Sequence, residues 1–70
     1  MSVYFLMKMK SQSDATPSIQ IRNEWFELLG ICQEGNWESI QQLTKSQLSA
    51  SEMKQRIAPI PYHQLTRTEL

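Results

Sequence analysis

A break at Gly35 is the feature that most constrains how this sequence folds. Two polar residues, Gln33 and Glu34, precede the glycine, and Asn36 follows it directly. Glycine adopts the left-handed backbone that ends a helix at little cost, and asparagine is a favoured N-cap for a following helix. The segment therefore predicts a corner: one helix stops at Gly35, and a second helix begins at Asn36 with Trp37 in its first turn.

The residues before this corner predict a first helix that begins at Ser18 or Asn23 and ends at Gln33. Either Thr16 would cap it, with Pro17 at the first helical position, or Asn23 would cap it, with Glu24 and Glu27 near its positive end. Apolar side chains follow one another at i, i+4, i+7 and i+11, a helical stripe. They are Ile21, Trp25, Leu28 and Cys32.

Two further helices are predicted after the corner. The first carries Trp37, Ile40 and either Leu43 or Thr44 on its inward face. The next begins at Ser49, because Ser49 and Glu52 have the S-x-x-E spacing of a capping box. Its buried contacts would be Met53 and Ile57, and Pro59 would end it.

The two ends of the chain have different patterns. Residues 3–9 alternate in a way that permits a short strand, which would pair with residues 19–21 or with a second chain; the alternative is an N-terminal segment outside the fold. Residues 11–18 are small and polar, as in a linker. The tail has no periodic pattern, and its end, Thr68-Glu69-Leu70, fits a motif that adds to a sheet edge.

These patterns predict a mainly α protein of two or three helices, a helical hairpin plus a short third helix. An N-terminal segment and linker (1–17) precede a helical domain (18–58), and a proline-containing, extended tail (59–70) follows. A domain of 70 residues buries about 60% of its unfolded surface, so we expect it to gain stability from a partner or a second copy.

The chemistry-bearing residues are too few for a catalytic or metal site. Cys32 is the sole cysteine and His63 the sole histidine, and the predicted elements separate them. A thiol nucleophile requires a base, and zinc requires three or four ligands. We expect no enzyme activity, no cofactor and no metal. One cysteine excludes an internal disulfide, and no apolar run nears the ~20 residues of a membrane span, which favours the cytoplasm.

A DNA-binding role is an alternative. Residues 39–57 are similar to a helix-turn-helix, and Lys54, Gln55 and Arg56 on its second helix would meet phosphates or bases. The chain has seven basic and seven acidic residues, and residues 19–44 are acidic. A neutral chain lacks the positive field typical of nucleic-acid binders.

The corner also carries a family resemblance. Residues 24–48, above all Glu34-Gly35-Asn36-Trp37-Glu38-Ser39-Ile40 followed by Leu43, resemble the helix–G-(D/N)-W–helix corner of flagellar FliT-type export chaperones. A similar corner occurs in the C-terminal helices of HDOD signalling proteins. The resemblance implies a helical hairpin that offers an apolar groove or face to another protein.

The favoured function is therefore a small, non-catalytic protein–protein interaction protein: a regulator, an adaptor or a chaperone-like partner. It would bind another protein or itself, as a homodimer, through a helical apolar face. The candidate contact residues are Trp25, Phe26, Leu29, Trp37 and Ile40.

Overall fold

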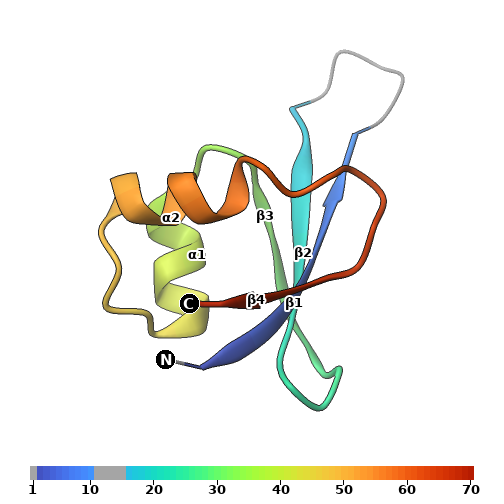
Figure 1. Cartoon of the computed structure of the whole chain (residues 1–70), viewed down its shortest axis with the longest axis horizontal. Coiled ribbons are helices and arrows are strands. Elements are labelled where there is room, and N and C mark those ends of the chain that lie inside the picture. Colours follow the sequence, from blue (N-terminus) through green and yellow to red (C-terminus); the bar gives the residue numbers. More distant parts are fainter. Residues whose placement is uncertain (1, 11–15) are drawn as a thin grey trace.

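The computed structural model describes residues 2–10 and 16–70, which form a four-stranded antiparallel sheet and two short helices (Figure 1). The elements are β1 (Val3–Met9), β2 (Ser18–Arg22), β3 (Leu28–Gln33), α1 (Trp37–Thr44), α2 (Ala50–Ile57) and β4 (Thr66–Glu69). The strand order is β3-β2-β1-β4. Both helices lie on one side of the sheet (Figure 1).

The prediction of a mainly α protein is wrong. The first predicted helix is instead the β2–β3 hairpin. Ile19 and Ile21 are both fully buried, and residues two apart share a face in a strand but not in a helix. Two members of the predicted helical stripe are exposed, Trp25 at 73% and Leu28 at 50%. The helical spacing of these apolar residues is a coincidence, because they lie in two different strands and in the loop between them.

The ends of the chain join the sheet. The strand alternative for residues 3–9 is confirmed, since Leu6 lies opposite Ile21 and Lys8 opposite Ile19. On its other side β1 pairs with β4, so the tail is not a free extension. Leu70 is buried, and its N–H donates to the Ser2 carbonyl at 3.0 Å. Residues 11–15 of the predicted linker lie outside the described residues.

The N-terminal caps of α1 and α2 are the ones that the sequence predicts. Gly35 has a φ of 101°, the left-handed conformation that favours glycine. The Asn36 side chain accepts a hydrogen bond from the Ser39 N–H at 3.3 Å and caps α1. Ser49 and Glu52 form the complete capping box of α2. The corner is nevertheless a strand–turn–helix, because β3 rather than a helix precedes Gly35.

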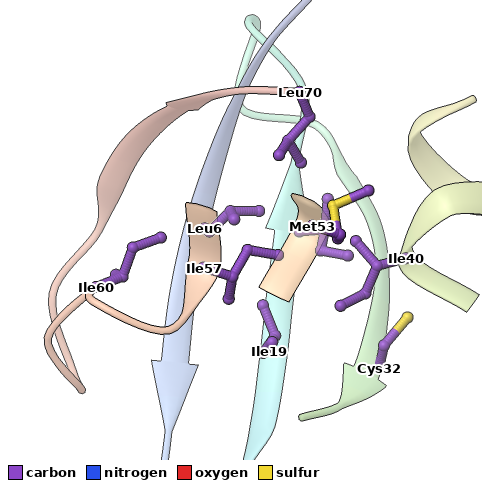
Figure 2. Close-up of a cluster of buried hydrophobic side chains, with 9 residues drawn as sticks. Leu6, Ile19, Cys32, Ile40, Met53, Ile57, Ile60 and Leu70 are labelled. Atoms are coloured by element: carbon purple, nitrogen blue, oxygen red, sulfur yellow. The ribbon is translucent and has the colours of Figure 1, made fainter. Parts of the chain in front are cut away.

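The core lies between the sheet and the helices. In Figure 2, side chains from the sheet point toward Ile40 of α1 and toward Met53 and Ile57 of α2. The buried apolar set is Leu6, Ile19, Ile21, Cys32, Ile40, Met53, Ile57, Ile60 and Leu70. Both helices cover this one face, and no helix or strand among residues 2–10 and 16–70 covers the opposite face, which we call the open face. Neither helix of the described ranges is long and apolar enough to cross a membrane.

Candidate protein-binding surface

The loop between β2 and β3 is held by a set of hydrogen bonds centred on Asn23. Its Oδ1 accepts from the backbone N–H groups of Trp25 and Glu27, both at 2.9 Å. Its own backbone N–H donates to the Glu27 carbonyl at 3.0 Å, and its carbonyl accepts from the Phe26 N–H at 3.0 Å. Asparagine side chains often order a turn in this way. The loop is therefore preorganised.

Phe26 occupies an unusual backbone conformation in this loop. Its φ is 64°, which is an outlier for a bulky side chain. The Arg22 guanidinium donates to its carbonyl at 2.7 Å, and its ring stacks on Phe5 with 4.5 Å between centroids. Such conformations cost about 1–3 kcal/mol and persist where the surroundings hold them. Here the result is that Phe26 turns back onto the sheet while Trp25 projects into solvent.

The open sheet face continues this apolar surface. Phe5 and Met7 of β1 point away from the helices, because their neighbours Leu6 and Lys8 are buried on the helix side. On β3, Ile31 is 57% exposed, next to the buried Cys32. We call Trp25, Phe26, Leu28 and Ile31, the exposed large apolar residues of the hairpin, the hairpin surface.

The structure brings together only some of the predicted contact residues. Trp25 and Phe26 are consecutive in the loop, and both are exposed residues of the hairpin surface. Leu29 and Trp37 are half-buried against the core, and Ile40 is fully buried within it. These three side chains support the fold. The apolar face of α1, which carries Trp37 and Ile40, is directed at the core rather than at a partner. Sequence reasoning missed Phe5 and Ile31, and the alternation at residues 3–9 was the signal for Phe5.

The residues proposed for DNA contact lie on the opposite side of the fold from the open face. Lys54, Gln55 and Arg56 are exposed on α2, while Met53 and Ile57 pack it onto the sheet. The Arg56 guanidinium donates to the Glu69 carbonyl at 2.9 Å.

A second polar cluster surrounds Lys8. Its ammonium is almost fully buried, 3.5 Å from a Glu34 carboxylate oxygen and 3.1 Å from the Ala58 carbonyl. It also lies 4.5 Å from the centre of the Tyr62 ring. The Tyr62 hydroxyl donates to Glu34 at 2.7 Å, and this hydrogen bond raises the pKa of Tyr62, with burial and the Glu34 charge adding to it.

This cluster holds three parts of the chain together. Lys8 joins β1 to the carboxyl end of α2, where backbone carbonyls favour a cation. A cavity of about 250 Å³ lies elsewhere, beside Thr44, Leu48 and Leu70.

Cys32 and His63, the other two residues considered for chemistry, lie in different parts of the fold. The buried Cys32 sulfur lies 3.3 Å from the Ser39 hydroxyl, and His63 is exposed in the segment before β4. Within residues 2–10 and 16–70, no group of three or more histidine, cysteine or acidic side chains is arranged to hold a metal.

The fold and its surface thus define a small antiparallel sheet protein with one helix-covered face and one open face. No protein-family model, no curated protein and no solved structure matches the chain. The resemblance to FliT-type chaperones stays a prediction.

Proposed function

We propose that this chain is a non-catalytic protein–protein interaction protein, a regulator, adaptor or chaperone-like partner, which binds through its hairpin surface. The observation that carries the proposal is Trp25. Its side chain is 73% exposed although tryptophan is large and mostly apolar. The hydrogen bonds of Asn23 hold the loop that presents it. Tryptophan is enriched among residues that dominate binding energy, and a preordered loop loses less entropy on binding.

The neighbouring residues support this role. Phe26, Leu28 and Ile31 extend the apolar area, and Arg22 lies beside Phe5 and Leu28 across the strands. Aromatic residues and arginine are common in the centres of interfaces. A contiguous exposed apolar patch is typical of a contact site. We place the protein in the cytoplasm, in line with its single, buried free cysteine.

Site-specific photo-crosslinking tests the proposal. A benzophenone amino acid at position 25 is compared with the same group at Gln55, which is exposed on α2. We expect specific protein adducts from position 25 in the source cell, and their loss when Leu28→Ser is added. Adducts that form equally from both positions would count against the hairpin surface.

The alternative is a DNA-binding regulator that uses α1 and α2. The observation in its favour is that Lys54 and Arg56 are exposed on α2. Duplex binding that weakens with salt, and falls when Lys54→Ala and Arg56→Ala are introduced, would support it. If Trp25→Ala lowers protein binding while no duplex binding occurs at low salt, the alternative is excluded.

A further inference from the structure

The outer edge of β3 differs from the other edge of the sheet. β2 pairs with β3 on one side, and no described element pairs with the other side. Natural edge strands are usually short or carry charged residues that prevent pairing. The opposite edge, β4, is four residues long and contains Arg67 and Glu69. β3 has six residues and no charge among them, so its edge lacks this protection.

The backbone groups of Ile31 point out of this edge. The Glu34 N–H donates to the Pro17 carbonyl at 2.7 Å, so this pair is a hydrogen-bonded one. Hydrogen-bonded and non-hydrogen-bonded pairs alternate in an antiparallel ladder. Ile31, which lies opposite Gln20, is therefore in a non-hydrogen-bonded pair. Its N–H and its C=O face away from β2.

Ile31 is the residue around which a new strand would be centred. Toward the loop, a register irregularity between Ile21 and Arg22 distorts the ladder. Toward the corner, the Gln33 carbonyl already accepts from the Asn36 N–H at 3.1 Å. The part of the edge with regular register thus offers one complete donor–acceptor pair, at Ile31, whose side chain is exposed.

We propose that a second copy of this chain pairs antiparallel with β3, with Ile31 opposite its own copy on a two-fold axis. The two residues would exchange N–H to C=O hydrogen bonds, and their side chains would meet on the continuous open face. The flanking charges agree with this register. Glu34 falls opposite Leu28 of the other copy, and Glu27 falls opposite Gly35. A shift by one residue would place Ile31 opposite Gly30 or Cys32, whose backbone groups face β2. The shift toward Gly30 would also oppose Glu27 to Glu34, two like charges.

Introducing a charge at Ile31, on the proposed two-fold axis, tests the register of the dimer. Sedimentation should show a concentration-dependent dimer for the unmodified protein. Ile31→Lys and Ile31→Glu should each raise the dimer dissociation constant by about tenfold or more, because each places like charges opposite each other. An equimolar mixture of the two variants should regain a dimer. A monomeric unmodified protein, or a mixture that stays monomeric while both variants are folded, overturns the proposal.

Two controls separate the edge from other surfaces. Gln20→Lys changes the open face beside Ile31 without touching the edge, and it should leave the dimer intact. Equal disruption by Gln20→Lys would show face-to-face association instead. Trp25→Ala should also leave the dimer intact. The dimer proposal can therefore fail or succeed independently of the proposal that the hairpin surface binds a partner.

Hydrogen exchange provides a readout that requires no variant. In the unmodified protein, the Ile31 amide should exchange more slowly as the protein concentration rises. Amides on the outer edge of β4 should not change. An Ile31 amide whose exchange is independent of concentration, in a sample that dimerises, would place the interface elsewhere and overturn the proposal.

Discussion

The Lys8 ammonium lies 3.5 Å from the Glu34 carboxylate, and it is almost fully buried. The ion pair connects the middle of the sheet to the corner that begins at Glu34. The same ammonium bonds to the carbonyls of Ile57 and Ala58, so three parts of the chain meet at one charge. A lysine in the core is tolerated here because its charge is paired and its protons have acceptors.

Removing this charge should destabilise the fold. Lys8→Met keeps an unbranched apolar side chain, one atom shorter, but leaves the two carbonyls without this donor and Glu34 without its cation. We expect the free energy of unfolding in urea to fall by about 1–3 kcal/mol, the cost of unsatisfied buried groups. Adding Glu34→Gln should recover part of the loss, since the uncompensated carboxylate is then gone. A variant as stable as the unmodified protein would show that the pair contributes nothing.

Tyr62 should make stability sensitive to alkaline pH. Its hydroxyl donates to Glu34, which raises its pKa above the usual value of 10.0. The neutral phenol is therefore favoured by folding. Its stabilisation is complete below the unfolded pKa and is lost as the pH rises through the higher, folded pKa. Urea unfolding at several alkaline pH values should show this loss.

Matched variants isolate the contribution of Tyr62 to the loss of stability at alkaline pH. Tyr62→Phe should remove this part of the alkaline loss, and Glu34→Gln should return the phenol titration toward its ordinary pKa. Tyr4→Phe is the control, since Tyr4 donates to the Thr44 carbonyl and does not contact Glu34. If absorbance shows that Tyr62 titrates below its ordinary pKa, the hydrogen bond to Glu34 is absent in solution.

The helices could be predicted from the sequence because their signals are local. Asn36 with Ser39, and Ser49 with Glu52, lie within one turn of each other, and each cap forms as predicted. The position of Met53 and Ile57 in the core likewise follows from helical spacing. Short-range chemistry of this kind does not depend on the rest of the fold.

The hairpin could not be predicted because its deciding contacts are not local. Residues 18–33 fit a helical period, and Asn23 fits a helix cap as well as it fits a loop. Pairing with β1 decides between them, since Leu6 and Lys8 supply partners for Ile21 and Ile19. Of the candidate site, Trp25 and Phe26 were predicted, but their exposure follows from the loop rather than from a helical stripe.

Gly30 sets how closely α1 approaches the sheet. A Cβ at this position would lie 2.9 Å from Leu43 Cδ1, closer than a normal contact. Gly30→Ala should therefore lower the free energy of unfolding by about 1–3 kcal/mol, the usual effect of overpacking. The loss should lie near the lower end of this range, because the contact is with the end of the Leu43 side chain, which can move aside. In the Leu43→Ala background, Gly30→Ala should cost less, which a double-mutant cycle measures. Equal costs in both backgrounds would show that the two residues do not contact.

Asn23 should control the order of the loop that presents Trp25. Asn23→Ala removes the acceptor for the Trp25 and Glu27 amides, so we expect a loss of about 1–2 kcal/mol in unfolding free energy. The NMR order parameter of the Trp25 amide should fall as the loop loosens. Asn23→Asp keeps the acceptor oxygens but loses the donor to the Glu27 carboxylate. It should retain the order of Trp25 with a smaller loss of stability.

Partner binding should follow the order of the loop rather than the stability of the fold. Asn23→Ala leaves the Trp25 side chain in place but allows it more conformations in the free protein, and binding must then order them. Its affinity for a partner crosslinked from position 25 should therefore fall, while Gly30→Ala, which destabilises the fold without touching the loop, should bind at full affinity when folded. If both variants weaken binding in proportion to their stability, the loop is not the preorganised contact that its hydrogen bonds indicate.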